Sequence, residues 1–355
     1  MIPLFKPYVS SKAGKIVTDT LNSGYIGEGP RVKEFERILE RMLGGYVVLV
    51  NSCTSALHLA LQMTNVDGYE VITTPMTCLA TNTPIVHNGG KIVWADIEPD
   101  TGNIDINSIR EKIIDRTKAI VCVHYGGNLC SPELVSLCNR HGITLIEDCA
   151  HLIGEGLGGL QCYSFQAIKF LTTGDGGALV TKDKQVYDRA KLLRWYGLDR
   201  EKGCTMRCMN SIPEVGHKFH MNDIAASIGI ANHDDLPYIT GKTQEHARMY
   251  NKAFSGLRNI MTIPTEVRND YWMYILLVNN RDYFIDYMKN SNIEVSLVHA
   301  RNDIQPVFSE SKCDLPGLEQ FWSKQVCIPV GWWLEDRDID YIINKVCEYD
   351  KVRSN

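Results

Sequence analysis

Residues 163–169 read Tyr-Ser-Phe-Gln-Ala-Ile-Lys, and the stretch Thr-Gly-Asp-Gly-Gly follows at residues 173–177. Upstream, residues 147–151 read Glu-Asp-Cys-Ala-His and close an apolar run. These stretches place an acid at the end of a predicted strand, an amine at Lys169 and a hydroxyl, Ser164, close to that amine in the sequence. Apolar runs that end in polar residues are typical of parallel α/β sheets, whose ligands gather at the carboxyl ends of the strands.

An amine, an acid and a hydroxyl are the groups that the chemistry of pyridoxal 5'-phosphate (PLP) needs. Lys169 would hold this cofactor as a Schiff base, and Asp148 would keep its pyridine nitrogen protonated as an electron sink. Ser164 would help to bind its phosphate. Taken singly, Lys169 is typical of a solvated surface charge and Asp148 of a cap or a strand-end acid. Their combination predicts a PLP site.

Residues 51–56 read Asn-Ser-Cys-Thr-Ser-Ala and join a predicted strand to a predicted helix. Hydroxyl groups and free backbone N–H groups at a helix start form an anion site that suits a phosphate. Thr54 and Ser55 are the candidates at this turn. The alternative, that these residues are ordinary helix caps, stays open at this point.

The chain has 355 residues, of which 44% are hydrophobic, and a net charge of −5. This composition supports a sizeable core divided over two lobes. Acidic and basic residues are interspersed, no apolar run is long enough to span a bilayer, and the N-terminus lacks the pattern of a secretion signal. We therefore expect neither nucleic acid nor a membrane as a partner, and a cytoplasmic location.

Twelve cysteines are scattered along the chain, and several fall inside predicted strands, such as Cys122. Scattered thiols of this kind behave as small apolar residues in a reducing compartment. The closest pair, Cys204 and Cys208, has no second pair of cysteines or histidines at zinc-finger spacing. We therefore expect no metal site.

Short β-branched runs alternate with longer mixed segments from about residue 46. Strands are predicted at residues 46–50, 70–73, 91–95, 119–123, 143–146 and 177–180. Helices are predicted at residues 55–63, 78–87, 105–115, 131–141 and 184–196. The alternation predicts an α/β fold with a mostly parallel, mixed central sheet flanked by helices. Ser52, Thr77 and Asp148 each follow a predicted strand, so they are expected at one edge of that sheet.

The pattern changes after about residue 235. A long helix is predicted near residues 239–257, an apolar run covers residues 271–278, and helical segments follow at residues 281–290 and 336–349. We expect a large PLP-binding α/β domain at residues 1–235 and a smaller C-terminal α+β domain at residues 236–355. Whether the N-terminal residues complete the smaller lobe stays open.

At these motifs the chain resembles the DegT/DnrJ/EryC1/StrS family of PLP-dependent sugar aminotransferases, which have fold-type-I architecture. The resemblance runs over nearly the whole chain. It begins with Gly-x-x-x-x-Gly-Pro at residues 24–30 and Phe-Glu at residues 35–36. It continues through the predicted helix start at residues 51–61 and two strand ends at residues 74–77 and 123–126. It is most specific around the acid, at residues 147–151, and around the lysine, at residues 164–177.

The resemblance implies a role for each matching residue. Lys169 would form the covalent link to PLP and then move the substrate proton, and Asp148 would pair with the pyridinium nitrogen. Thr54, Ser55 and Ser164 would hold the phosphate. His151 would lie near the ring oxygen of the cofactor.

Residue 218 lies in a segment where the family carries an Asn that reaches the phosphate of the neighbouring subunit's cofactor. The resemblance therefore implies a homodimer with shared active sites. Lys218 stands at this position, and its ammonium group would neutralise the phosphate as a point charge. His220 replaces a usual Arg, and its role is open.

Three further departures from the family pattern surround the predicted site. Cys78 replaces an aromatic residue that stacks on the pyridine in many relatives, so stacking must be weaker or come from elsewhere. Cys53 replaces a glycine, which indicates ordinary backbone angles at this residue. Residues 152–162 form a shortened, glycine-rich segment, and its effect on the cofactor loop is open.

Three residues are weaker candidates for substrate contacts. His124 ends a predicted strand, and a structural histidine is as good an interpretation as a substrate contact. His299 and Arg301 lie where related enzymes place sugar-nucleotide contacts. Arg301 is expected to meet either a diphosphate or an acid of the protein.

The expected activity is transfer of an amino group from L-glutamate to a keto carbon, C4 or C3, of a nucleotide-linked keto-deoxysugar such as a 4-keto-6-deoxyhexose. One alternative is a PLP-dependent sugar dehydratase of the same family. Such enzymes typically replace the lysine by histidine, so Lys169 argues against it. The other alternative is a catalytically silent sensor or scaffold with the same fold. The nucleotide, the sugar and the pathway cannot be read from the sequence.

Overall fold

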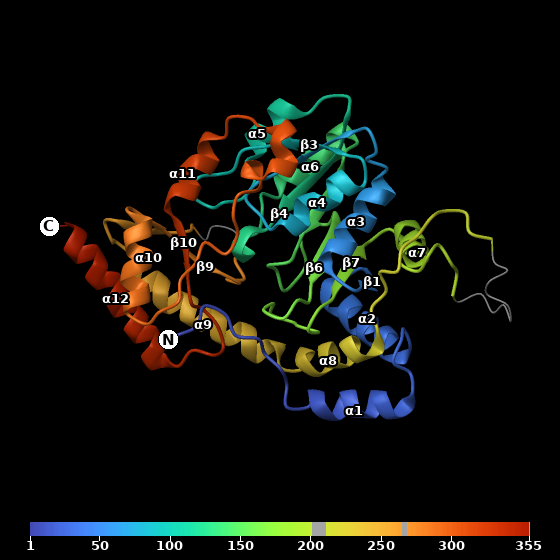
Figure 1. The fold of residues 1–355 in the computed structure, drawn as a ribbon, viewed down its shortest axis with the longest axis horizontal. Coiled ribbons are helices and arrows are strands. Elements are labelled where there is room, and N and C mark those ends of the chain that lie inside the picture. Colours follow the sequence, from blue (N-terminus) through green and yellow to red (C-terminus); the bar gives the residue numbers. More distant parts are fainter. Residues whose placement is uncertain (201–210, 265–267, 355) are drawn as a thin grey trace.

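A seven-stranded sheet forms the centre of the part of the chain that the computed structural model describes, which is residues 1–200, 211–264 and 268–354 (Figure 1). Its strand order is β1-β7-β6-β5-β4-β2-β3. All neighbours are parallel except β7, which runs antiparallel to both β1 and β6. The strands are β1 (Tyr46–Val50), β2 (Glu70–Thr73), β3 (Lys91–Trp94), β4 (Thr117–Val123), β5 (Thr144–Asp148), β6 (Leu160–Ser164) and β7 (Gly177–Thr181).

Helices cover both faces of the sheet, because its strands are apolar on both sides. One face packs on α5 (Ile106–Lys112) and α6 (Glu133–His141), with Ile120 and Leu145 in the shared apolar cluster. The other face packs on further helices of the large lobe: α2 (Pro30–Leu43), α3 (Cys53–Thr64), α4 (Leu79–His87) and α7 (Lys184–Leu193). Helices α1 (Ala13–Ser23) and α8 (Asp223–His233) lie alongside each other at the edge of this layer (Figure 1).

A smaller lobe with its own apolar cluster follows α8. Its antiparallel sheet has the order β10-β9-β8. The strands are β8 (Ile260–Thr262), β9 (Tyr274–Val278) and β10 (Gln325–Ile328), and the helices are α9 (Leu236–Phe254), α10 (Arg281–Asn290), α11 (Pro316–Lys324) and α12 (Asp336–Ser354). Short 3-10 turns lie at η1 (Tyr125–Gly127), η3 (Asn302–Ile304) and η4 (Pro306–Ser311).

The N-terminal residues join the smaller lobe. Ile2 forms a parallel bridge with Ile293, and the backbone N–H of Ile2 donates to the carbonyl oxygen of Asn292 over 2.7 Å. This pairing shows that the N-terminal residues help to complete the smaller lobe, a point that the sequence left open. The division of the chain into domains at residue 235 remains our proposal.

The predicted fold class is confirmed: the sheet is mixed but mostly parallel, helices flank it, and a smaller α+β lobe follows. None of the described helices is both long and apolar enough to pass through a bilayer. Cys204 and Cys208, for which no metal site was expected, lie outside the described residues.

Candidate active site

The strand register brings the predicted site residues to one edge of the large sheet. Val50, at the end of β1, pairs with Gly177, and Gly177 pairs with Ser164, at the end of β6. On the next pair of strands, Asp148 at the end of β5 is paired with Cys162. The polar residues that follow β1, β5 and β6 therefore meet at the carboxyl ends of these strands, as the sequence predicts.

Asp148 lies on the face of the sheet that α3 and α4 cover. It is 5% exposed, and its Oδ2 accepts a hydrogen bond from the Thr81 hydroxyl over 2.7 Å. The Thr81 hydroxyl also lies 2.7 Å from that of Thr77. The backbone N–H of Ala150 donates to Oδ1 over 3.0 Å. The carboxylate is thus fixed in direction and retains acceptor capacity, since a carboxylate offers about four acceptor positions.

Lys169 carries its amine into the same region. Burial of this amine lowers the pKa of Lys169 to about 7, and the negative charge of Asp148 partly offsets the effect. A lysine with such a pKa is largely a free amine just above neutral pH, the form that acts as a nucleophile or a base. Lys169 and Asp148, the two residues on which the predicted site depends, therefore interact electrostatically.

Aromatic rings line the site beside Lys169. The Lys169 Nζ lies 3.3 Å from the centroid of a Trp272 ring, and the His151 ring stacks on Trp272 at 4.1 Å between centroids. His299 continues the stack, with its Nε2 3.4 Å from that of His151. Burial lowers the pKa of His151 well below its ordinary value and that of His299 to about 3. Both imidazoles are therefore neutral at physiological pH.

The start of α3 lies next to Asp148, with the Cys53 Sγ 4.0 Å from the Asp148 Oδ1. Ser52 caps the helix, because its hydroxyl accepts from the backbone N–H of Ser55 over 3.1 Å. Thr54 and Ser55 follow in the first turn, whose backbone N–H groups lack partners within the helix. The turn packs closely on β7: a Cβ at Gly177 would lie 2.5 Å from the Cys53 nitrogen. Cys53 is helical without a positive φ, which confirms the expectation of ordinary backbone angles.

The segment around Lys218 runs along the end of β1. The Asn51 N–H donates to the carbonyl oxygen of Phe219 over 2.6 Å, and His220 forms a bridge with Val50. The Lys218 side chain is exposed. The His220 ring meets Trp195 edge-on at 3.8 Å between centroids, and burial lowers its pKa to about 4. The structure thus gives His220 a packing role.

Two of the substrate candidates, His124 and Arg301, have partners within the protein. His124 is fully buried: its Nε2 lies 3.0 Å from Glu147, and its Nδ1 accepts the N–H of Cys130 over 3.1 Å. The structural alternative for His124 therefore holds.

Arg301 is also occupied. Its guanidinium donates to both carboxylate oxygens of Asp303 and to Glu319, and the residue is 7% exposed. These acids raise the pKa of Arg301 above its ordinary value. A diphosphate would have to compete with two carboxylates that are already in contact. Of the three weaker candidates, His299 alone lies beside Lys169.

The shortened segment at residues 152–162 is organised by a buried acid. The Glu147 carboxylate accepts the backbone N–H groups of Leu157, Gly158 and Gly159 over 2.5, 3.0 and 2.6 Å. The Nε2 of His124 supplies the fourth donor. One carboxylate thus binds the glycine-rich loop directly.

Cys122, His124, Glu147, Cys130 and Cys149 bring potential metal ligands together in this network. Both nitrogens of the imidazole and both oxygens of the carboxylate already have hydrogen-bond partners. Hydrogen bonding therefore accounts for the arrangement of this cluster.

Sequence reasoning missed two residues of the site. Thr81 lies four residues after Thr77, the spacing that puts two hydroxyls on one face of a helical segment. This spacing was the available signal. Trp272 lies in an apolar run that predicts core packing, and no local pattern separates it from a core residue.

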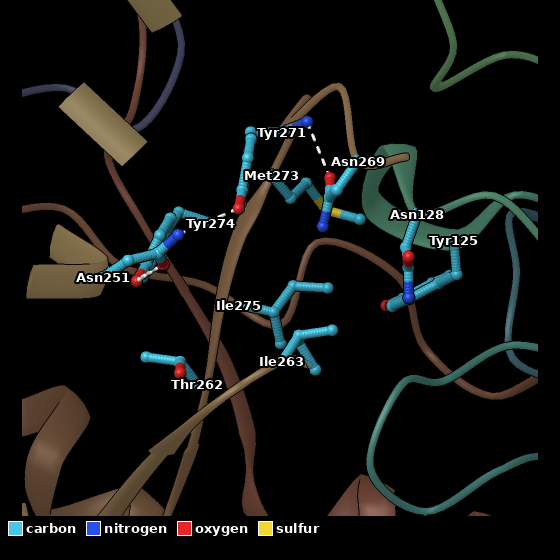
Figure 2. Close-up of a pocket in the computed structure, with 10 residues that line it drawn as sticks. All are labelled: Tyr125, Asn128, Asn251, Thr262, Ile263, Asn269, Tyr271, Met273, Tyr274 and Ile275. Atoms are coloured by element: carbon cyan, nitrogen blue, oxygen red, sulfur yellow. Dashed lines mark hydrogen bonds between the residues drawn. The ribbon is translucent and has the colours of Figure 1, made fainter. Parts of the chain in front are cut away.

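A small pocket lies where the smaller lobe meets η1 (Figure 2). Its lining residues come from η1, α9, β8 and β9 and from the turn before β9: Tyr125, Asn128, Asn251, Thr262, Ile263, Asn269, Tyr271, Met273, Tyr274 and Ile275. The pocket is separate from the edge of the sheet that carries Asp148. Tyr125 of this lining meets the rings of His151 and His299 edge-on, with centroids 6.1 and 6.4 Å apart.

The fold and this site define the protein as an enzyme of the transaminase class. The model of the DegT/DnrJ/EryC1/StrS aminotransferase family matches residues 8–347. The chain therefore belongs to the DegT/DnrJ/EryC1/StrS aminotransferase family, whose members are PLP-dependent.

Known proteins of similar sequence and structure agree with this membership. The sugar aminotransferase CalS13 of Micromonospora echinospora is 33% identical with a TM-score of 0.94, over 98% of this chain and 100% of that one. The GDP-perosamine synthase of Escherichia coli O157:H7 is 28% identical over 98% of both chains. Helicobacter pylori PseC, an aminotransferase involved in the biosynthesis of pseudoaminic acid, is 26% identical with a TM-score of 0.91, over 99% of both chains.

Proposed function

We propose that this enzyme transfers an amino group from L-glutamate to the C4 or C3 keto carbon of a nucleotide-linked keto-deoxysugar, with PLP as the cofactor. The pairing of Lys169 with Asp148 in one site carries the proposal. The similarity to a GDP-perosamine synthase and to sugar aminotransferases supports the class of substrate. A homodimer with shared active sites, to which Lys218 contributes, is part of the proposal.

The residues present fit PLP. A buried carboxylate, Asp148, suits a protonated ring nitrogen, and Lys169 suits the carbonyl carbon of the cofactor. The start of α3 with Thr54 and Ser55, together with Ser164, offers a helix N-terminus and hydroxyls to a phosphate. The close packing at Gly177 keeps this turn against the sheet edge.

PLP, when bound, withdraws electrons from the carbon that carries the amino group, so that the proton on this carbon becomes acidic. Lys169 is the group that can take up this proton and return it, because burial lowers its pKa to about 7. Asp148 contributes a fixed negative charge, held in direction by Thr81. The stacked rings of His151 and Trp272 exclude water beside the amine.

His151 is held as a hydrogen-bond donor. Its Nδ1 accepts the backbone N–H of Gly126 over 3.2 Å, so the proton of the neutral ring lies on Nε2. This Nε2 faces His299 and the site. The arrangement suits a ring oxygen or a substrate oxygen that needs a neutral donor.

A direct test uses the cofactor and substrates together. Purified protein supplied with PLP should show a visible absorption band that borohydride removes, and Lys169→Ala should lose the reducible link. Incubation with L-glutamate and a panel of nucleotide-linked keto-sugars should give a product with the mass change of amination. A deoxygenated sugar instead would indicate the dehydratase, and failure to bind PLP would indicate a silent scaffold.

A further inference from the structure

Trp272 contacts both the amine of Lys169 and the backbone next to it. The Lys169 Nζ lies 3.3 Å from a ring centroid of Trp272, well within the range of a cation–π contact. The indole N–H of Trp272 donates to the carbonyl oxygen of Ile168 over 3.0 Å. The indole is 4% exposed and comes from the turn before β9, far in sequence from the lysine.

The indole is held in its orientation by its neighbours. His151 stacks on it with an angle of 11° between the ring planes, and Phe5 stacks on it with an angle of 22°. These contacts come from β5's end and from the N-terminal segment. With the hydrogen bond to Ile168, they leave the ring little freedom to turn away from Lys169.

The backbone before Trp272 adopts a conformation that side chains rarely take. Tyr271 has a φ of +55°, in the left-handed region. Its N–H donates to Asn269 Oδ1 over 2.7 Å, and its hydroxyl accepts from Asn251 Nδ2 over 3.0 Å (Figure 2). Val298, next to His299, has a φ of +60°. Trp272 and His299, the two residues of the smaller lobe in the stack, therefore each follow a residue with strained backbone angles. Such strain is common at functional sites.

We propose that Trp272 is a positioning residue. It holds the amine of Lys169 on its ring face whenever this amine has no covalent bond to a cofactor. The proposal rests on the proposed function only for the statement that Lys169 is the reacting amine. The contact keeps the amine beside Asp148 instead of letting the flexible side chain sample other rotamers. Trp272 also provides an aromatic surface close to Lys169. In this chain Cys78 stands at the position where many relatives carry the aromatic residue that stacks on the pyridine ring of PLP.

A cation–π contact stabilises the charged amine, whereas burial favours the neutral one. Replacement of Trp272 by Leu keeps an apolar neighbour but removes the ring, so proton affinity at Lys169 should fall. The expected decrease is about three- to tenfold, which lowers the midpoint of its titration by about half to one pH unit. Other titratable groups act on the same amine and are unchanged in the variant: Asp148, Cys53, Cys78, His151 and His299.

The test follows the titration of Lys169 in cofactor-free protein. The full chain is labelled briefly with acetic anhydride over a pH series, and mass spectrometry quantifies acetylation of the peptide that contains Lys169. Trp272→Leu should label at a lower pH than the wild type, and Trp272→Phe should fall between the two. If the Leu variant does not fold, Trp272→Met takes its place with the same expected shift. Circular dichroism establishes folding for each.

Trp332→Leu is the matched control, because Trp332 lines a second small pocket together with Lys169 and Trp272 but carries Lys6 on its ring at 5.4 Å. This variant should leave the Lys169 titration unchanged. An unaltered midpoint in folded Trp272→Leu or Trp272→Met would overturn the proposal. Because no cofactor or substrate is present, the outcome is independent of whether the chain aminates a sugar.

Discussion

Two adjacent carboxylates end β5, and their surroundings differ completely. Side chains alternate along a strand, so Asp148 faces α3 and α4, whereas Glu147 faces α6. Glu147 receives four hydrogen bonds, from His124 and from the loop after β5. Asp148 receives bonds from Thr81 and Ala150 and acts on a buried amine. A buried acid whose acceptor positions are filled is structural, and one that keeps capacity beside a perturbed lysine is chemical.

The largest expected effect is on transamination activity, and it should follow from removal of the Lys169 amine. Lys169→Met removes the nucleophile and base but retains the apolar stem, so transamination should fall by about 10⁴-fold or more. Steady-state assays with glutamate and a keto-sugar nucleotide measure the loss, and thermal unfolding serves as the control. Substantial remaining activity in a folded variant would remove Lys169 from the chemistry.

Substitution of Asp148 should affect activity more than folding. Asp148→Asn keeps the shape, since its amide oxygen can accept the Ala150 N–H and its NH₂ can donate to the Thr81 hydroxyl. It loses the negative charge, so activity should fall by about 10²- to 10³-fold. Its unfolding midpoint should change little. Equal losses of activity in Asp148→Asn and Glu147→Gln would show that the two faces of β5 are not functionally distinct.

Glu147→Gln is expected to affect stability more than activity. The new amide NH₂ group would face backbone N–H donors in a fully buried site, which should lower the free energy of unfolding by about 3 kcal/mol. Chemical denaturation measures this change. Unaltered stability would contradict the role given to Glu147 in holding the shortened loop.

The loop itself can be tested with one added methyl group. A Cβ at Gly159 would lie 2.5 Å from the Leu145 carbonyl oxygen, so Gly159→Ala should destabilise the protein by about 2 kcal/mol. Gly154→Ala is the control in the same segment, since its nearest neighbour would lie at 3.5 Å. Similar stability of the two variants would argue against close packing of the loop on β5.

The smallest effect is a dependence on pH. Burial alone would raise the pKa of Glu147, but His124 and the N–H groups of Leu157 and Gly159 lower it below 4.5. A carboxylate with a depressed pKa stabilises the fold above its unfolded pKa and loses this contribution as the pH falls through the folded one. The stability advantage of the wild type over Glu147→Gln should therefore shrink as the pH falls from about 5 to below about 4. Denaturation at several pH values measures it, and an advantage that grows on acidification would contradict this assignment.

Local patterns predicted much of the large lobe. The bounds of β1 and β2 agree with the predicted residues 46–50 and 70–73, because short β-branched runs between turn residues are strong strand signals. They did not predict α1, α2, α8 or β6. Helix α8 has no clear polar face, and β6 is a short mixed run whose place is fixed by its neighbours β5 and β7.

The site shows the same limit. Asp148 and Lys169 were predictable because each belongs to a specific motif at a strand end or close after one. Arg301 and His124 were not decided by the sequence, since a cation or an imidazole is equally suited to a ligand and to a buried acid. In the structure Arg301 donates to Asp303 and His124 lies 3.0 Å from Glu147, and the direction of these side chains does not follow from local pattern alone.

The sequence by itself determined the class of fold, the family and the two residues on which the proposed chemistry depends, because apolar periodicity and short motifs are local properties of the chain. The tertiary structure decided which ring lies beside Lys169, which acid holds the shortened loop and which cations are already paired. The first depends on a contact between residues more than 100 positions apart, Trp272 and Ile168, and the other two depend on the direction in which side chains point. Such contacts arise only when the strands and the smaller lobe pack together.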